Sequence, residues 1–119
     1  MKRAITIGKT TDPYSPAVVT TRQKTIYVSG QIATEVEADV QTQTRQVLQK
    51  IENILGEEEA FLSDIIKTTV FLIDINDFPK VNEVYSQSFP MDPPARSTVQ
   101  VVALPMGAHI MIDAIAVRD

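Results

Sequence analysis

The chain has no cysteine among its 119 residues and only one histidine, His109. Without cysteine it forms no disulfide, no thiolate nucleophile and no cysteine-ligated zinc or iron–sulfur centre. A single histidine also excludes a histidine-rich metal centre. Walker sequences, Gly-rich dinucleotide turns and Gly-x-Ser-x-Gly are missing too. The sequence therefore predicts no metal site, and any chemistry must proceed by binding, orientation and acid–base groups.

Long apolar runs and clustered positive charge are also missing. Residues 1–5 begin as a signal peptide would, but polar residues within 6–12 interrupt the run. No stretch approaches the roughly 20 apolar residues of a membrane span, so a cytoplasmic protein without a membrane anchor is the simplest interpretation. The 11 Lys and Arg are scattered, and 15 Asp and Glu give a net charge of −4. Nucleic-acid binding is therefore not expected, since it requires clustered basic residues.

The residues that are present indicate a globular protein. A hydrophobic fraction of 44% and a charged fraction of 22% are sufficient for a core and argue against disorder. The length predicts one domain over residues 1–119. A domain of this size buries a modest share of its surface, so oligomerisation would be a natural source of further stability.

Two amphipathic helices are predicted from apolar residues at helical spacing. The first follows Asp39, a suitable N-cap. Its end is left open, because Gly56 can end it or the acidic residues 57–59 can add a turn; acids at a helix C-terminus favour the earlier end. The second runs from its N-cap, Asp77, to Phe89.

The remaining β-branched and apolar runs predict strands. These lie at 3–7, 17–20, 25–29, 65–73, 96–103 and 109–117, with the second and third expected to pair as an antiparallel hairpin. The order of elements predicts an α/β two-layer sandwich, a mixed sheet of about six strands with both helices on one face. The last strand is apolar on both sides, so the uncovered face is expected to pack against another subunit.

Two charged residues in this pattern are candidates for chemistry. Arg96 follows Pro93-Pro94-Ala95, so its guanidinium is presented from a stiff support and suits bidentate binding of a small metabolite's carboxylate. A solvated arginine or a structural salt bridge is the alternative. Asp113 lies between Met111 and Ile115 on an apolar strand face, where desolvation would suit it to proton transfer. The alternative is a carboxylate paired with a nearby cation.

Four other residues are weaker candidates. Tyr14 is held between a proline and a serine, and either contributes its hydroxyl to a site or covers the core. Ser29 and Gly30, at a predicted strand end, offer a hydroxyl and a backbone that a ligand can approach closely, or form a simple turn. Asn82 on the second helix has a site role or a capping or bridging role.

Short motifs spread over nearly the whole chain resemble the reactive intermediate deaminase family, also called the endoribonuclease L-PSP family. Each motif is weak alone, but the ordered set is specific. The matching stretches are 13–15 (PYS), 28–32 (VSGQI), 44–48 (TRQVL), 66–72 (IKTTVFL), 77–78 (DF) with 81–85 (VNEVY), 94–97 (PARS) and 114–117 (AIAV).

The resemblance implies a chorismate-mutase-like fold, a homotrimer and a site in each cleft between subunits. It also implies hydrolysis of enamine and imine intermediates, such as 2-aminoacrylate, to 2-keto acids and ammonia without a cofactor. Arg96 matches the arginine that binds the substrate carboxylate. Tyr14, Ser29 and Gly30 match residues that line the same pocket, and Asn82 matches a position on the second helix.

Two site positions depart from the family pattern. Asp113 stands where the family has a glutamate, and one methylene less sets the carboxylate back by about 1 Å. Thr98 stands where a cysteine is common, and is expected to complete the polar lining. In the resulting hypothesis Arg96 fixes the imine and Asp113 deprotonates the attacking water.

Two other functions are alternatives to this hypothesis. One is a non-catalytic binding or regulatory protein for small 2-keto acids, which the shorter Asp113 favours. The other is the endoribonuclease or translation-inhibitor activity in the family's older name, which fits poorly with an acidic chain that lacks a basic face.

Overall fold

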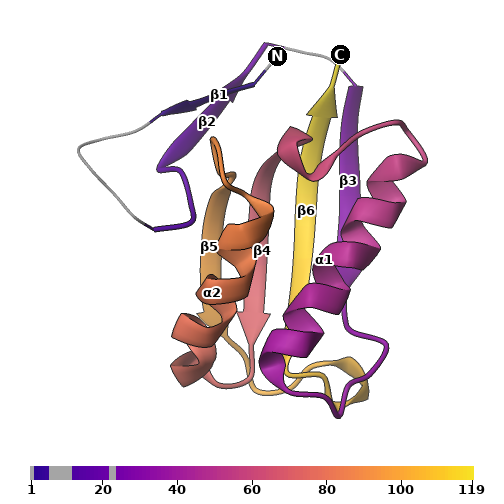
Figure 1. The fold of residues 1–119 in the computed structure, drawn as a ribbon, viewed down its shortest axis with the longest axis vertical. Coiled ribbons are helices and arrows are strands. Elements are labelled where there is room, and N and C mark those ends of the chain that lie inside the picture. The colour runs from indigo at the N-terminus through magenta and orange to yellow at the C-terminus, as the bar shows by residue number, and fades with distance from the viewer. Residues whose placement is uncertain (1, 6–11, 22–23) are drawn as a thin grey trace.

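The computed structural model of the protein describes residues 2–5, 12–21 and 24–119. Two helices cover one face of a four-stranded sheet, and a separate two-stranded ribbon lies beside one end of that sheet (Figure 1). The helices are α1 (Val40–Gly56) and α2 (Phe78–Ser88). The strands are β1 (Lys2–Ile5), β2 (Ala17–Thr20), β3 (Lys24–Gln31), β4 (Ile65–Leu72), β5 (Ala95–Gln100) and β6 (Ile110–Arg118).

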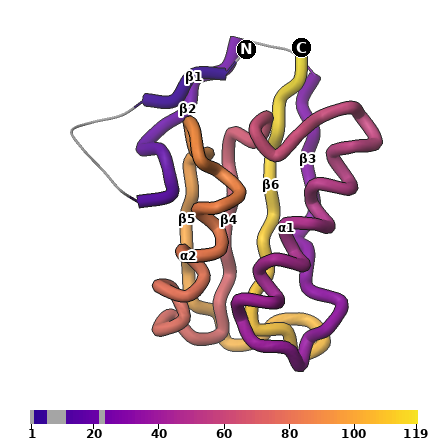
Figure 2. Tube along the Cα trace, in the orientation of Figure 1, coloured from indigo at the N-terminus to yellow at the C-terminus, as the bar shows by residue number. Residues whose placement is uncertain are grey.

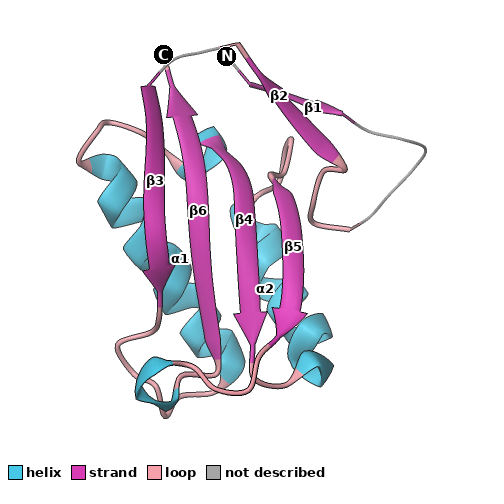
Figure 3. Cartoon of the chain, turned by 180° about the vertical axis from the view of Figure 1, so that it is seen from behind, coloured by secondary structure: helices cyan, strands magenta, loops and turns pink. Residues whose placement is uncertain are grey.

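The four-stranded sheet has the order β3-β6-β4-β5 and mixes both kinds of pairing (Figure 3). β6 is antiparallel to β3 and β4, whereas β4 and β5 are parallel and are joined through α2. Such a connection is required because parallel neighbours cannot be joined by a tight turn. α1 packs over β3 and β6 and beside α2 (Figure 2). The predicted two layers, with both helices on one face, are confirmed.

Helix α1 begins and ends where its local sequence indicates. The Asp39 Oδ1 accepts a hydrogen bond of 2.8 Å from the backbone N–H of Thr42, and this bond holds the pKa of Asp39 below its usual value. The helix ends at Gly56, the earlier of the two predicted ends, and Glu59 then adopts a left-handed φ of 58°. No helix in the described part of the chain is long and apolar enough to cross a membrane.

Alternate residues of the sheet face opposite environments. Ile110, Ile112, Ala114 and Ala116 of β6 are buried beneath the helices. They pack in one core with fully buried side chains of both helices and β4, which are Val47, Ile51, Leu55, Val81, Tyr85, Ile65, Val70 and Leu72. We call this side the helix-covered face. The intervening residues lie on the other side, the open face, which includes Met111, Asp113 and Ile115 of β6 and Lys67, Thr69 and Phe71 of β4.

The predicted hairpin between residues 17–20 and 25–29 is wrong. β2 pairs with β1, and β3 pairs with β6. A tight hairpin requires residues that readily adopt left-handed conformations, usually Gly, Asn or Asp, and residues 21–23 (Thr-Arg-Gln) include none. The six predicted strands therefore form two sheets rather than one. Residues 6 and 7 of the first predicted strand lie outside the described residues.

The fifth strand is also shorter than predicted, because its partner ends. β5 stops at Gln100 instead of residue 103. The backbone N–H of Val101 donates a last hydrogen bond of 2.8 Å to Leu72, the final residue of β4. Among the described residues, no strand pairs with the chain beyond this point of β5.

Candidate functional site

Arg96 lies on the helix-covered face, beneath α2. It is the second residue of β5 and pairs in register with Thr68 of β4. Its Nη1 donates a hydrogen bond of 2.7 Å to Oδ1 of Asn82 on α2. Arg96 and Asn82, both predicted site residues, are therefore in direct contact, because an arginine near the start of an edge strand reaches toward the adjacent helix.

Three aromatic rings surround the Arg96 guanidinium. Its Cζ lies 4.9 Å from the ring centroid of Tyr85, 5.1 Å from that of Phe78 and 5.7 Å from that of Tyr14. Ring faces attract a cation, and guanidinium is less strongly hydrated than ammonium. Burial lowers the pKa of Arg96, while electrostatic interactions with Tyr85, Asp12 and Tyr14 act in the opposite direction. The side chain remains a cation because arginine does not deprotonate in proteins.

Arg96 directly contacts a neutral amide and aromatic rings, and the charge of Asp12 also acts on it. Arg96 takes part in neither of the ion pairs between Lys24 and Glu58 and between Arg118 and Asp64. Arg96 instead donates to a neutral amide, through one of its five N–H groups. A carboxylate that reaches this position can form the paired hydrogen bonds for which a guanidinium is suited.

The Tyr85 side chain lies against the Arg96 guanidinium and is uncharged. Its hydroxyl shares a buried hydrogen bond of 2.7 Å with the Thr68 hydroxyl. Burial raises the pKa of Tyr85 to about 12, although the Thr68 hydrogen bond and the Arg96 charge lower it. The phenol is therefore protonated at neutral pH and does not neutralise Arg96.

Thr98 presents a hydroxyl without a partner on the same side of β5. It follows Arg96 by two residues, so both side chains face the helices. Its Oγ1 is buried and has no hydrogen-bond partner in the described structure. A buried hydroxyl without a partner costs about 1–3 kcal/mol, which is why such atoms are uncommon. This atom is suited to accept or donate a hydrogen bond when a ligand is present.

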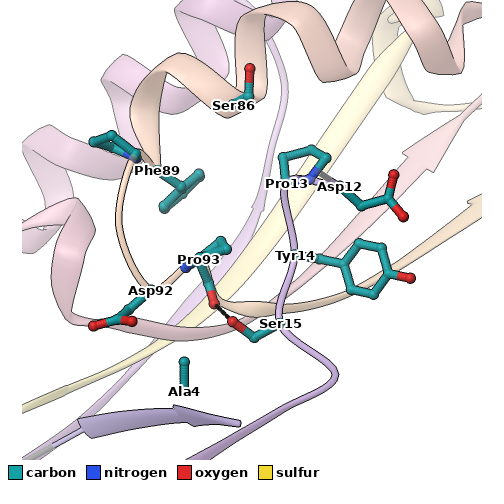
Figure 4. A pocket seen from close by; sticks show the side chains of 10 residues that line it. Ala4, Asp12, Pro13, Tyr14, Ser15, Ser86, Phe89, Asp92 and Pro93 are labelled. Atoms are coloured by element: carbon teal, nitrogen blue, oxygen red, sulfur yellow. Dashed lines mark hydrogen bonds between the residues drawn. The ribbon is translucent and has the colours of Figure 1, made fainter. Parts of the chain in front are cut away.

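Tyr14 is brought to this group by the segment that precedes β2. Next to it, Ser15 pairs with Ala95 as an isolated parallel bridge, immediately before Arg96. A cavity of about 350 Å³ opens beside this segment (Figure 4). Its lining comes from β1, the 12–15 segment, the end of α2 and the loop before β5, and comprises Ala4, Asp12, Pro13, Tyr14, Ser15, Ser86, Phe89, Pro90, Asp92 and Pro93.

Asp113 lies on the open face of the sheet, on the side opposite Arg96. It pairs in register with Thr69, and its Oδ1 accepts a hydrogen bond of 3.1 Å from the Thr69 backbone N–H. Lys67 also contacts Thr69, because its Nζ donates a hydrogen bond of 3.2 Å to the Thr69 hydroxyl. One carboxylate oxygen of Asp113 is therefore held against the sheet.

Ser29 and Gly30 lie opposite Asp113 in an irregularity of β3. The pairing of β3 with β6 shifts between Val28 and Gln31, so two residues of β3 stand where regular pairing would have one. A Cβ added to Gly30 would lie 2.7 Å from Sδ of Met111, so a larger residue here would require the flexible Met111 side chain to move. The strand does not end at Gly30 and the simple-turn interpretation is wrong.

The seven predicted site residues therefore form two groups. Arg96, Asn82, Tyr14 and Thr98 lie toward the helices, whereas Asp113, Ser29 and Gly30 belong to the open face. β4 separates β5 from β6, so the groups differ in both strand and face. One copy of the chain does not bring Arg96 and Asp113 to the same side of its sheet.

Comparison with known proteins shows the family to which the chain belongs. The family model described as Endoribonuclease L-PSP matches residues 4–118. The chain is a member of this reactive intermediate deaminase family. The human protein named 2-iminobutanoate/2-iminopropanoate deaminase is 43% identical over 112 residues, which cover 89% of this chain and 80% of the human one. Protein DfrA of Myxococcus xanthus is 42% identical over 115 residues, covering 92% and 88%.

Solved structures agree with this assignment. A crystal structure of a putative endoribonuclease from Thermotoga maritima is 39% identical, and the match covers 100% of this chain and 99% of that one with a TM-score of 0.77. This member of the reactive intermediate deaminase family therefore has the α+β fold of its relatives, two helices on a mixed sheet. Several relatives carry the name of an enzyme that acts on small imines.

Two aromatic residues of the site in this family member were not among the predicted site residues. Phe78 and Tyr85 lie within the predicted second helix and contact the Arg96 guanidinium. Phe78, Asn82 and Tyr85 recur at spacings of four and three residues, which places them on one face of a helix. That spacing around Asn82 is the signal that could have identified them. The role of Thr69 had no such signal, because it depends on its register with Asp113.

Proposed function

We propose that this protein hydrolyses small 2-imino acids, or their enamine forms such as 2-aminoacrylate, to 2-keto acids and ammonia. The observation that carries the proposal is the Arg96 guanidinium, hydrogen-bonded to a neutral amide and enclosed by three aromatic rings. Relatives with about 43% identity named 2-iminobutanoate/2-iminopropanoate deaminase support the choice of substrate.

Binding of the substrate carboxylate is assigned to Arg96. Asn82 holds one end of the guanidinium and leaves other N–H groups for two parallel hydrogen bonds to the carboxylate. The surrounding rings exclude water, which strengthens the interaction between the charges. The Thr98 hydroxyl is available to a polar group of the same substrate. The carboxylate is thereby held in one orientation, with the imine carbon at a defined position.

Proton transfer is assigned to Asp113. Its Oδ1 is held by the Thr69 N–H, so the second oxygen accepts a proton from water as that water adds to the imine carbon. Asp113 returns this proton to the imine nitrogen, which gives the carbinolamine. The hydroxyl of the carbinolamine then passes its proton, through Asp113, to the amine nitrogen as the carbon–nitrogen bond breaks, so that ammonia leaves and the carbon becomes the carbonyl of the 2-keto acid.

The separation of Arg96 and Asp113 leads us to place the site between copies of the chain in a homotrimer. Each copy is a single domain. Each site takes Arg96 from one copy and Asp113 from its neighbour. The open face supports this arrangement, since it exposes apolar side chains such as Tyr27 and Val99, which are 76% and 43% exposed. A sedimentation mass of three chains is expected.

Mixed assemblies test whether each site takes residues from two copies. Arg96→Ala and Asp113→Asn are each expected to be inactive. When the two variants are unfolded together and refolded, random assembly pairs an intact Arg96 with an intact Asp113 at about a quarter of the sites. Recovery of about a quarter of wild-type activity is expected. No recovery, with mixed trimers shown by mass spectrometry, would contradict the shared site.

The activity itself is tested by following the decay of 2-aminoacrylate made in place by an amino-acid dehydratase. The wild type is expected to accelerate the decay, and Arg96→Ala to lower kcat/KM by about 10²- to 10³-fold, since the carboxylate loses its charged partner. Arg118→Ala is the control, because that arginine pairs with Asp64 instead. Equal rates for wild type and Arg96→Ala would overturn the proposal.

A second function, non-catalytic binding of 2-keto acids, is favoured by one observation. The Asp113 carboxylate is held by the Thr69 amide, and it is a methylene shorter than glutamate. Thermal stabilisation of the wild type by 2-ketobutyrate, without acceleration of 2-aminoacrylate decay, would select this function over hydrolysis.

A further inference from the structure

Ser15 joins two proline-containing segments at the edge of the site. It is 2% exposed. Its backbone N–H donates a hydrogen bond of 3.0 Å to the carbonyl of Pro94, and its hydroxyl donates to the carbonyl of Pro93. Figure 4 shows the latter contact among the side chains that line the cavity. Both polar groups of Ser15 are thus used on the residues that lead into β5.

These contacts position two residues of the site, Tyr14 and Arg96, relative to each other. On one side, Tyr14 directly precedes Ser15 in the chain and its ring centroid lies 5.7 Å from Cζ of Arg96. On the other side, the bridge from Ser15 to Ala95 ends one residue before Arg96. Ser15 therefore connects an aromatic ring to the cation that it faces, although Tyr14 and Arg96 lie far apart in the sequence.

Prolines make the hydroxyl contact difficult to replace. Pro93 and Pro94 have no backbone N–H, so this stretch cannot donate main-chain hydrogen bonds and pairs through its carbonyls. A side chain that cannot donate at position 15 would leave the Pro93 carbonyl without this donor. The backbone hydrogen bond to Pro94 would remain, so the 12–15 segment would keep only part of its attachment to the residues before β5.

We propose that Ser15 is a positioning residue that holds Tyr14 against the Arg96 guanidinium and thereby sets the affinity for the substrate carboxylate. This inference rests on the proposed function for the identity of the ligand. A structural role alone, in joining the β1–β2 ribbon to the sheet, would change stability without changing ligand affinity in folded protein.

The test measures KM and kcat for imine hydrolysis and the dissociation constant of 2-ketobutyrate in folded variants. Ser15→Ala is expected to raise KM and the dissociation constant about 10-fold, since a displaced Tyr14 ring no longer encloses the Arg96 guanidinium that binds the carboxylate. kcat is expected to change by less than about threefold. Ser15→Thr, which keeps the hydroxyl, is expected to restore tight binding. Ser63→Ala, at an exposed serine, is the control and should match wild type.

A double-mutant cycle shows whether Ser15 acts through Tyr14. In a Tyr14→Ala background, Ser15→Ala is expected to change the dissociation constant by less than about twofold, because the ring it positions is absent. A full 10-fold effect in that background would overturn the proposal. If Ser15→Ala does not fold, Ser15→Cys keeps the size with a weaker donor, and an unchanged dissociation constant for folded Ser15→Cys would overturn it as well.

The outcomes separate this inference from the proposed function. Turnover by wild type together with an unchanged dissociation constant in Ser15→Ala would leave hydrolysis standing and overturn the role of Ser15. Absence of turnover together with weakened 2-ketobutyrate binding in Ser15→Ala would overturn hydrolysis and support the role of Ser15. Absence of both turnover and 2-ketobutyrate binding in the wild type would overturn both.

Discussion

The two faces of the β3-β6-β4-β5 sheet carry different chemistry, although the same strands supply both. On the helix-covered face, Arg96 is held by a helix amide and by aromatic rings that restrict water. On the open face, Asp113 is held by a backbone N–H of the neighbouring strand. The cation thus depends on packing against α2, whereas the carboxylate depends on strand register. A change in one layer should therefore affect binding, and a change in the other should affect proton transfer.

The largest expected effect separates the two charged groups kinetically. Asp113→Asn is expected to lower kcat by about 10²-fold or more, the usual contribution of a general base. It should leave the dissociation constant of 2-ketobutyrate near wild type, because Arg96 is untouched. Arg96→Ala should abolish that binding. Calorimetry with 2-ketobutyrate, alongside the 2-aminoacrylate assay, checks both; loss of binding in Asp113→Asn would show that the two faces do not act separately.

A longer side chain at position 113 tests whether the reach of the carboxylate on the open face limits the reaction. Asp113→Glu extends the side chain by about 1 Å and is expected to raise kcat, by up to about 10-fold if reach limits the reaction. KM should change little, since the helix-covered face is unaltered. A lower kcat would mean that the position of Asp113, held by Thr69, is already the productive one.

A smaller effect compares hydroxyl groups of two tyrosines. Tyr85→Phe leaves the buried Thr68 hydroxyl without its partner, and should lower the free energy of unfolding by about 1–3 kcal/mol. Tyr27→Phe on the open face, where the ring is 76% exposed, should change it by less than about 0.5 kcal/mol. Urea unfolding of both variants provides the measurement, and equal effects would contradict the assignment of the two environments.

The smallest effect concerns two threonines of the helix-covered face. Thr98→Val removes a buried hydroxyl that has no partner, and should stabilise the ligand-free protein by about 1 kcal/mol. Thr68→Val removes the partner of Tyr85 and should destabilise it. Thermal unfolding of the pair gives shifts of opposite sign; destabilisation by Thr98→Val would show that its hydroxyl has a partner in solution.

Local patterns predicted the elements better than their pairing. Asp39 and the apolar spacing after it predicted α1, because capping and helical periodicity act over a few residues. The hairpin of residues 17–20 and 25–29 was predicted wrongly, because strand pairing joins residues distant in the chain and adjacency in sequence does not ensure it. The predicted end of β5 lay three residues too far along the chain for the same reason, since the end of β5 depends on where β4 ends.

The candidate site divides in the same way. The type and local support of Arg96 were visible in the sequence, in the prolines that precede it and in the resemblance of the PARS segment to the deaminase family. The aromatic enclosure by Phe78 and Tyr85 requires α2 to cross over β5, and the hydrogen bond from Thr69 to Asp113 requires the register of β4 and β6. Ser15 had no separate signal, because its partners Pro93 and Pro94 lie far along the chain.

The sequence by itself determined the family, the two helices, most strand positions and the residues able to bind a carboxylate or transfer a proton. These follow from composition, short-range periodicity and an ordered set of motifs. The tertiary structure alone decided which side of the sheet each residue occupies. A side chain's face alternates along a strand and depends on register, which is set by packing against distant elements. For that reason Arg96 and Asp113, both identified from sequence, lie on opposite faces.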